Sequence, residues 1–180
     1  TKPFWGNSVK SWVISYYNPV YIKNVYKGII GIDISISKLM EILLGERQNK
    51  KFTYENSYPI LASQDGILVA TNSLGYENLN IKEGATAGTN LLNFNSDSFK
   101  KVISKMVDPK SWDPDTSDKD LGGVEKVNIN NKEYYVFYFP VRTANLTFAI
   151  VSPLENVEKI VTLNIEKSKP AASALKSKIM

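Results

Sequence analysis

The sequence contains no cysteine and no histidine. These two absences exclude zinc sites built from Cys and His, thiol nucleophiles, and any mechanism that rests on a histidine base. The missing cysteines are compatible with any redox compartment. No apolar run is long enough to cross a bilayer, and the first residues lack a signal-peptide pattern.

The composition is that of an ordinary folded domain. Of the 180 residues, 43% are hydrophobic and 22% are charged, which excludes a disordered tail, a collagen-like repeat and a coiled coil. This length corresponds to one or two domains. The net charge of +4 is mild, and the lysines are spread along the chain. Nucleic-acid binding favours a concentrated basic stripe interleaved with aromatics, so we expect no nucleic-acid partner.

The N-terminal part of the chain predicts two strands and a helix. Residues 12–18 are rich in β-branched and aromatic side chains, and Pro19 should end this strand because it cannot donate to a ladder. Residues 21–35 predict a longer strand with one apolar core face and one face that carries Asp33 beside a glycine. Residues 35–44 predict a serine-capped helix.

The remainder predicts a five-stranded unit. Two strands joined by Asp65-Gly66 precede a helix, three further strands with short turns, and an exit helix. This order indicates an α+β fold, in which helices pack on an antiparallel sheet and the strand over 132–140 lies between its two late neighbours. The predicted strands are 58–63, 67–71, 124–129, 132–140 and 146–152, and the predicted helices are 96–107 and 154–166.

Several stretches resemble the Cache family of sensor domains. Pro19-Val20-Tyr21 and then residues 28–35 (GIIGIDIS) are similar to that family's Pro-Val-Tyr step, hairpin and Gly-x-x-Gly-x-Asp-Ile strand. Residues 60–70 (ILASQDGILVA) resemble its strand–Asp-Gly–strand opening. Residues 139–141 (FPV) and 149–153 (AIVSP) resemble its closing hairpin. Together these segments cover most of the chain.

The resemblance implies part of a double Cache region, which contains two PAS-like modules on the extracytoplasmic side of a membrane receptor. Residues 1–48 would be the C-terminal part of the membrane-distal module, and residues 49–165 the membrane-proximal module. Residues 166–180 would form an exit helix toward a transmembrane segment. The family implies a small-molecule ligand, usually in the distal module, and membrane tethering of the full-length protein. The apolar stripe of the exit helix is a candidate seam for a homodimer.

Two departures from the family pattern bear on the ligand. The first half of the distal module has no counterpart before Thr1, and two strands with one helix bury too little for a stable core. Amino-acid-binding members usually carry Pro-Tyr-x-Asp where this chain has Pro3-Phe4-Trp5-Gly6. The phenol and carboxylate that would hold an ammonium are missing. We therefore expect a neutral or a hydroxyl-bearing anionic ligand rather than an α-amino acid.

Asp33 is the residue that we expect to anchor a ligand. A buried carboxylate must be paired, hydrogen-bonded or protonated, and a ligand cation or hydroxyl can be its partner. The alternative is that Asp33 caps the following helix or accepts backbone N–H groups. Ser15 and Tyr17 are expected beside Asp33, where the neighbouring glycine leaves room for a ligand. Trp5 and Tyr21 complete the expected ligand-binding set, because aromatic side chains line small-ligand pockets.

Other groups carry weaker expectations. Tyr135, Tyr138 and Arg142 can line a second pocket, although both faces of the strand over 132–140 are apolar and a core role is favoured. Residues 108–120 predict an acidic loop that lacks the turn glycine and distal glutamate of an EF-hand, so we expect no metal site. No base–nucleophile pair accompanies the strand-end carboxylates, so we expect no enzyme activity and no cofactor.

The sequence thus predicts a non-enzymatic, extracytoplasmic small-molecule sensing domain of a transmembrane signalling receptor. Ligand binding would favour one arrangement of the pocket, and the exit helix would carry the change toward the membrane. The alternative is a structural or dimerisation spacer module that has lost ligand binding, which the departures at Phe4 and Gly6 favour.

Overall fold

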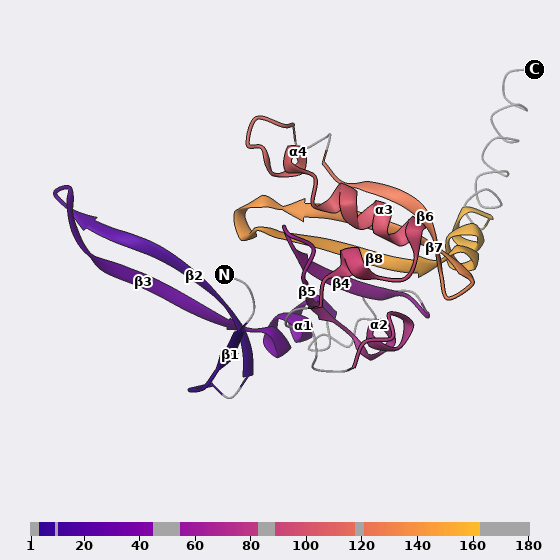
Figure 1. The fold of residues 1–180 in the computed structure, drawn as a ribbon, viewed down its shortest axis with the longest axis horizontal. Helices are drawn as coiled ribbons and strands as arrows, with labels where there is room; N and C mark the ends of the chain where they lie inside the picture. Colours follow the sequence, from indigo (N-terminus) through magenta and orange to yellow (C-terminus); the bar gives the residue numbers. More distant parts are fainter. Residues whose placement is uncertain (1–3, 10, 45–54, 83–88, 118–120, 163–180) are drawn as a thin grey trace, which may run out of the picture.

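The computed structural model describes residues 4–9, 11–44, 55–82, 89–117 and 121–162. Its strands form two antiparallel sheets, one in the order β1-β2-β3 and one in the order β5-β4-β8-β7-β6 (Figure 1). The predicted α+β fold with a five-stranded antiparallel sheet is confirmed. The expected domain boundary at residue 48 and the segment 166–180 lie outside the described residues.

The five-stranded sheet is built as the short turns predict. Its elements are β4 (Tyr58–Ser63), β5 (Leu68–Thr71), α2 (Ser73–Asn78), the 3-10 helix η2 (Leu91–Asn93), α3 (Asp97–Met106), α4 (Pro109–Trp112), β6 (Gly123–Ile129), β7 (Lys132–Val141), the 3-10 helix η4 (Arg142–Ala144) and β8 (Leu146–Pro153). Strand β7 lies between β6 and β8, as predicted. Asn130 and Asn131 turn the chain with positive φ, a conformation that asparagine tolerates and that matches the twist of a hairpin.

One face of this sheet is covered by α2 and α3 (Figure 1). The buried side chains of α3 recur at helical spacing and match the predicted stripe: Phe99, Val102, Ile103 and Met106. They pack on alternate residues of the strands, including Ile60 and Val151. Each such side chain contributes roughly 1.5–3 kcal/mol when fully buried. This face therefore holds the main hydrophobic core.

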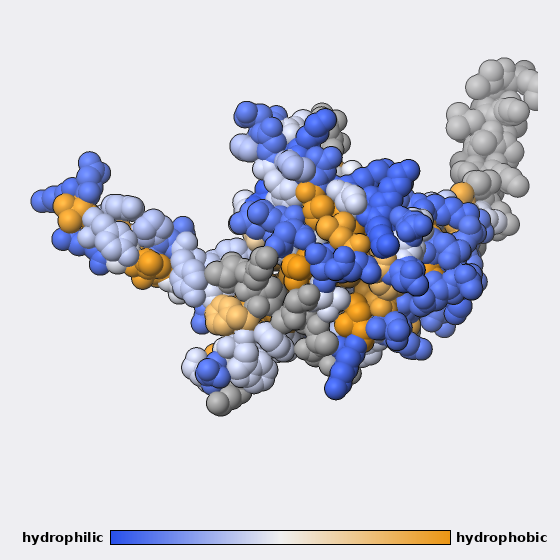
Figure 2. Space-filling model, viewed as in Figure 1, coloured by the Kyte–Doolittle hydropathy of each residue, from blue (hydrophilic) through white to orange (hydrophobic). Residues whose placement is uncertain are grey.

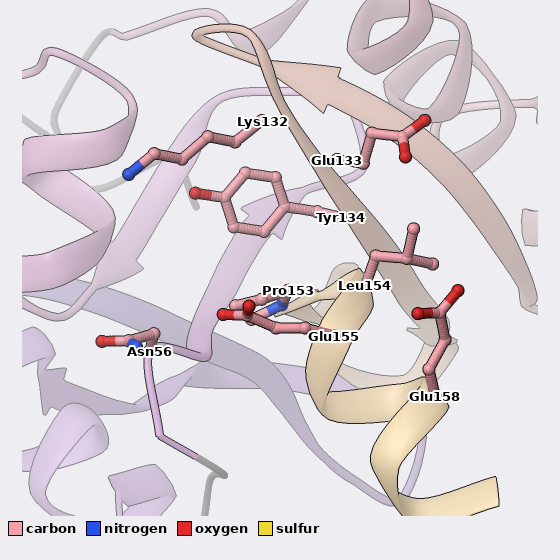
Figure 3. A pocket seen from close by; sticks show the side chains of 8 residues that line it. All are labelled: Asn56, Lys132, Glu133, Tyr134, Pro153, Leu154, Glu155 and Glu158. Atoms are coloured by element: carbon pink, nitrogen blue, oxygen red, sulfur yellow. The ribbon is translucent and has the colours of Figure 1, made fainter. Parts of the chain in front are cut away.

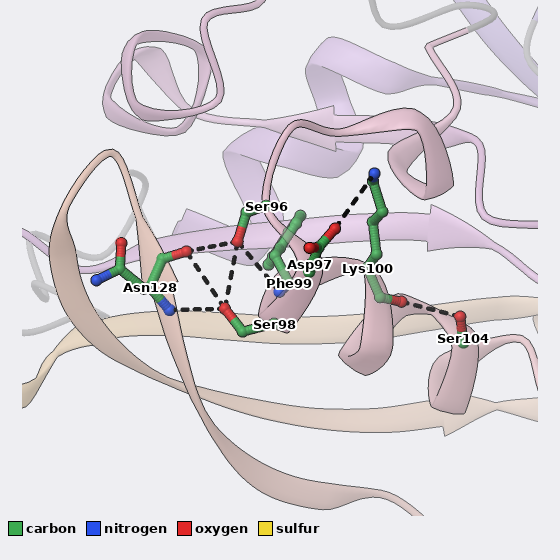
Figure 4. A network of polar contacts seen from close by, with 7 residues as sticks. All are labelled: Ser96, Asp97, Ser98, Phe99, Lys100, Ser104 and Asn128. Atoms are coloured by element: carbon green, nitrogen blue, oxygen red, sulfur yellow. Dashed lines mark hydrogen bonds and ion pairs between the residues drawn. The ribbon is translucent and has the colours of Figure 1, made fainter.

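Helix α3 begins where the sequence predicts and is fastened to β6 at that end. The Ser96 hydroxyl accepts a hydrogen bond from the Phe99 amide at 3.3 Å and donates to the Asn128 carbonyl (Figure 4). The Asn128 amide donates in turn to the Ser98 hydroxyl at 2.9 Å. Ser96 thus caps the Phe99 amide in the first turn, and the bonds with Asn128 fasten this end of the helix to β6.

The N-terminal elements are β1 (Phe4–Gly6), β2 (Ser11–Ile22), β3 (Val25–Ser35) and α1 (Ile36–Leu44). The predictions that Pro19 ends the first strand and that 21–35 is one strand are both wrong. Strand β2 continues to Ile22, and Lys23 and Asn24 make the turn with positive φ. Strand β1 pairs only with residues 11–13, so Pro19 lies where β2 has one paired edge and a proline is tolerated.

The opposite face of the five-stranded sheet is covered by the base of this N-terminal part. Because side chains alternate along a strand, Leu61 and Phe148 point away from α3. They belong to a second apolar cluster that joins Ile14 of β2 and Ile36 of α1 to the sheet. We call this set the back-face cluster. Its buried members are Ile14, Ile36, Leu61, Val69, Ala70 and Leu146, and its half-buried members are Trp12, Tyr16, Leu39, Ala144 and Phe148.

Beyond its base, the β2–β3 hairpin projects from the rest of the molecule (Figures 1 and 2). Ile30 and Ile32, which were expected on a core face, are 66% and 62% exposed. That expectation is wrong within the described residues, because the contacts of the hairpin with the five-stranded unit lie at its base. Apolar residues on both sides of the hairpin therefore face solvent.

The sequence analysis did not predict the short helices α2 and α4. Helix α2 interrupts the polar stretch after β5, and α4 interrupts the expected acidic loop. Asn72 caps α2 by accepting from the Gly75 amide, and Asp108 caps α4 by accepting from the Lys110 amide. Side chains that favour loops also favour helix N-caps, so composition alone did not separate the two. Within the described part of the chain, no helix is long and apolar enough to span a membrane.

Candidate ligand-binding site

Ser15 and Asp33 face each other across the β2–β3 ladder. The Ser15 hydroxyl donates a hydrogen bond to a carboxylate oxygen of Asp33. Ser15 is buried, whereas Asp33 is exposed, so the expectation that Asp33 is a buried carboxylate is wrong within the described residues: its hydrogen-bond partner is buried, but the carboxylate itself reaches solvent. The prediction that Asp33 has Ser15 or Tyr17 as its cross-strand neighbour is confirmed. A carboxylate held in this way keeps lone pairs for a further donor.

The space beside Gly31 is filled by the protein itself. Tyr17 is the cross-strand partner of Gly31, and its ring lies so close that a β-carbon on Gly31 would overlap ring atoms Cδ1 and Cε1. The expectation that this glycine leaves room for a ligand is therefore wrong, because the Tyr17 ring occupies that room. Tyr17 is itself 54% exposed and presents the outer face of its ring to solvent.

Trp5 and Tyr21 do not join this group. Trp5 pairs with Trp12 and packs edge-to-face on it, with ring centroids 5.8 Å apart. Directly paired residues share a face of the sheet, so Trp5 lies on the face opposite Ser15. Tyr21 packs on Tyr26 near the hairpin turn. It is six residues from Ser15, which is roughly 20 Å along a strand. The structure thus groups only Ser15, Tyr17 and Asp33.

The cap of α1 is supplied by Ser35. Its hydroxyl accepts from the Lys38 amide at 3.4 Å and contacts the Ser37 hydroxyl at 2.7 Å. The alternative role considered for Asp33, that of capping this helix, is thus filled by another residue.

Gly6, which stands where the family pattern described above has an aspartate, is closely packed by two valines. A β-carbon on Gly6 would lie 2.8 Å from Cγ2 of Val9 and 3.2 Å from Cγ2 of Val13. Gly6 is buried in this contact. The glycine at position 6 therefore fits the local packing, and an aspartate side chain there would require Val9 or Val13 to move.

A hollow that the sequence analysis missed lies where the chain leaves the five-stranded sheet (Figure 3). It has a volume of about 490 Å³ and lies between the start of β7 and the helix at residues 154–162. Its charged lining comprises Lys132, Glu133, Glu155 and Glu158. Tyr134 lines it as well; burial raises the pKa of its phenol, as does the nearby Glu155 charge. None of the predicted ligand-binding residues lines this hollow.

The three residues of the expected second pocket have structural roles. Tyr138 packs against the main core, and burial raises its pKa. The Arg142 guanidinium donates to the carbonyls of Ser111 at 3.2 Å and Thr116 at 2.6 Å, which fastens α4 and the chain after it to the end of β7. Tyr135 packs on Phe137. In the acidic loop, Asp118 and Asp120 lie outside the described residues; among those described, no three acidic side chains gather as a metal site would need.

A scan against protein families and a search of curated proteins find no match for the chain. Among solved structures, it is similar to the extracellular domain of mmHK1S-Z3, which is named as a histidine kinase. The identity is 20% and the TM-score 0.62, over 90% of this chain and 51% of that one. It is also similar to the ligand-binding domain of the Pseudomonas fluorescens chemoreceptor CtaA in complex with L-isoleucine. There the identity is 14% and the TM-score 0.53, over 89% and 53% of the two chains.

A third similar structure is the ligand-binding domain of the Pseudomonas aeruginosa chemoreceptor PctB in complex with L-Arg, at 14% identity and a TM-score of 0.52, over 87% of this chain and 54% of that one. The chain shares the fold of these extracellular and ligand-binding domains. The fold that the Cache resemblance predicts is thereby confirmed. The chain spans about half the length of the sensor domains that it matches.

Proposed function

We propose that the chain is a non-enzymatic, extracytoplasmic small-molecule sensing domain of a membrane-tethered signalling receptor. The observation that carries this proposal is the fold shared with extracellular domains of histidine kinases and chemoreceptors over about nine-tenths of the chain. Two of those domains are named with bound amino acids, L-Arg and L-isoleucine. Asp33 of β3 and Asp65 of the turn between β4 and β5 lie in different parts of the fold, so these two carboxylates do not form a catalytic pair.

The arrangement of strands supports a division into two modules. Strand β8 leads directly into the helix at residue 154, and β3 leads directly into α1. Strand β8 is paired on both edges, with β7 and with β4, whereas β3 pairs only with β2 among the described strands. The N-terminal hairpin and helix thus repeat the end of the five-stranded unit without the strands that complete it.

On this basis we assign residues 1–48 to the C-terminal part of a membrane-distal module and residues 49–165 to a membrane-proximal one. Further polypeptide would pair with β3 and cover the exposed faces of the hairpin; the match of this chain to about half of the similar sensor domains supports this. Residues 166–180 would continue the exit helix toward a transmembrane segment.

Within the distal module we propose Asp33, Ser15 and Tyr17 as the ligand-facing group. The Asp33 carboxylate would accept a hydrogen bond from the ligand, Ser15 would hold the carboxylate in place, and the Tyr17 ring would contact the ligand. The packed Gly6 supports a neutral or hydroxyl-bearing anionic small molecule over an α-amino acid.

A thermal-shift screen of the receptor's extracytoplasmic region tests this function. The panel contains amino acids, hydroxy acids and neutral polyols, because these differ in the ammonium that the departure at position 6 disfavours. A ligand present at 100 times its Kd stabilises the folded state by about 2.7 kcal/mol, which a melting curve resolves. A shift with a hydroxy acid or polyol supports the proposal, whereas a shift confined to amino acids overturns the ligand class.

A second candidate function is a spacer or dimerisation module without ligand binding. The Tyr17 ring over Gly31 favours it, because the protein fills the space that a ligand would use. The apolar residues of the exit helix offer a seam, since Val161 is 51% exposed. Sedimentation analysis of the Ile160→Glu variant tests this function. Weaker self-association of the variant, together with no ligand-induced shift in the screen, supports the spacer. An unchanged association constant shows that the exit helix is not the dimer interface.

A further inference from the structure

Tyr16 makes a polar contact between the N-terminal hairpin and the five-stranded sheet, across the back-face cluster. Its hydroxyl donates a hydrogen bond to the carbonyl of Ala144 at 2.8 Å. Tyr16 belongs to β2, and Ala144 ends the turn η4 between β7 and β8. Burial raises the pKa of Tyr16, whose phenol is protonated at neutral pH as in any tyrosine. The aromatic ring of Tyr16 packs against the back-face cluster.

The same strand carries the candidate ligand-facing group on its other side. Ser15 and Tyr16 are consecutive residues of β2, so their side chains point to opposite faces. Ser15 is bonded to Asp33 on one face, and Tyr16 is bonded to Ala144 on the other. A displacement of β2 that alters the first bond therefore moves the backbone that holds the second.

The turn that Tyr16 holds is tied to two other parts of the five-stranded unit. The Asn145 amide donates to the Arg142 carbonyl at 3.1 Å, and the Gln64 amide donates to the Asn145 carbonyl at 3.1 Å, which links the turn to the β4–β5 connection. Arg142 links it to α4 and the chain after it through the carbonyls of Ser111 and Thr116. A change at Ala144 thus reaches both connections through hydrogen bonds.

We propose that Tyr16 couples the two sheets, so that the state of the Ser15–Asp33 pair sets the stability of the β7–β8 turn. In the receptor this device would pass a ligand signal from the distal to the proximal module, a role that rests on the proposed function. The coupling itself needs no ligand and is a property of the 180-residue chain.

Amide hydrogen exchange of this chain tests the coupling through a double-mutant cycle. The reporters are the amides of Asn145 and Gln64, which are bonded within and beside the turn. Loss of one hydrogen bond in Tyr16→Phe should speed their exchange about three- to tenfold. Tyr26→Phe is the matched control, because it removes the hydroxyl of an exposed tyrosine near the hairpin turn, away from both the Ser15–Asp33 pair and Ala144, and it should leave both rates unchanged.

The second arm perturbs the Ser15–Asp33 pair. Ser15→Ala should speed exchange at Asn145 and Gln64 when Tyr16 is present and add nothing in the Tyr16→Phe background. Additive effects of the two substitutions, or equal effects of Tyr16→Phe and Tyr26→Phe, would overturn the coupling. Because no ligand is added, this result is independent of the thermal-shift screen: either proposal can fail while the other stands.

Discussion

The ring of Tyr17 lies over Gly31, its partner across the β2–β3 ladder, in the space that any larger residue at position 31 would need for its side chain. The two residues thus pack on each other in the part of the hairpin that projects beyond its buried base. A ligand that approaches this face meets the tyrosine ring and the neighbouring Asp33 carboxylate rather than bare backbone. The glycine in the Gly-x-x-Gly-x-Asp stretch therefore serves the placement of an aromatic side chain.

This packing predicts a strong coupling between positions 17 and 31. Gly31→Ala should weaken the β2–β3 pairing by about 1–3 kcal/mol, because the added methyl overlaps the Tyr17 ring. In a Tyr17→Ala background the same substitution should cost nothing, since the ring is gone. Hydrogen exchange of the strand amides measures both. An equal penalty in the two backgrounds would show that the ring does not lie over Gly31.

The buried hydroxyl of Tyr58 predicts a stabilising substitution. Tyr58 is fully buried in the main core, and no group among the described residues bonds to its hydroxyl. An unsatisfied buried polar group costs about 1–3 kcal/mol, so Tyr58→Phe should raise the free energy of unfolding at neutral pH. Tyr134→Phe is the control, because the Tyr134 hydroxyl donates to Asn78 at 3.0 Å and its loss should destabilise the fold. Denaturant unfolding compares the two variants, and destabilisation by Tyr58→Phe would contradict the assignment.

The same tyrosine predicts the response to alkaline pH. Burial raises the pKa of Tyr58 far above its usual value, with a further contribution from the neighbouring Tyr134. The unfolded chain releases this proton near pH 10, whereas the folded chain retains it. Stability is therefore independent of this group below about pH 10 and falls above it, by about 1.4 kcal/mol per pH unit. Urea unfolding at several alkaline pH values should show a shallower loss in Tyr58→Phe; an identical slope would contradict this account.

The main core predicts a clear contrast between two phenylalanines. Phe99 of α3 is fully buried and packs on Phe94 with ring centroids 5.2 Å apart. Phe99→Ala should lower the free energy of unfolding by about 3–5 kcal/mol through lost burial and the cavity left behind. Phe137 of β7 is 37% exposed, and Phe137→Ala should cost markedly less. Equal losses in thermal or denaturant unfolding would mean that α3 does not cover the sheet as described.

The five-stranded unit could be predicted from the sequence because its signals are local. Asn130-Asn131 and Asp65-Gly66 mark two of the turns, and the spacing of apolar residues in α3 marks its buried face. The course of β2 could not, because whether Pro19 ends a strand depends on how many neighbours the strand has there. Pairing is set by tertiary structure, so the hairpin turn at Lys23-Asn24 was missed.

The candidate site was predicted only in its centre. Alternation along two paired strands was enough to bring Ser15 and Tyr17 to Asp33 once the register was fixed. Whether Trp5 and Tyr21 lie near Asp33 depends on the face of the sheet and the end of the hairpin that they occupy. The aromatic composition of the segment does not determine either one. The contact between Tyr16 and Ala144 joins segments 128 residues apart in the chain, and no local pattern predicts a bond at that separation.

The central claim is that Asp33 anchors a small-molecule ligand in an extracytoplasmic sensor. Isothermal titration calorimetry tests it most directly, with the receptor's extracytoplasmic region and the compound that gives the largest thermal shift. Asp97, exposed on α3, provides the control substitution Asp97→Ala. A charge-assisted hydrogen bond is worth roughly 1.5–3 kcal/mol, so Asp33→Ala should raise the Kd by about one to two orders of magnitude while Asp97→Ala leaves it unchanged. Equal affinity in the wild type and Asp33→Ala would contradict the account.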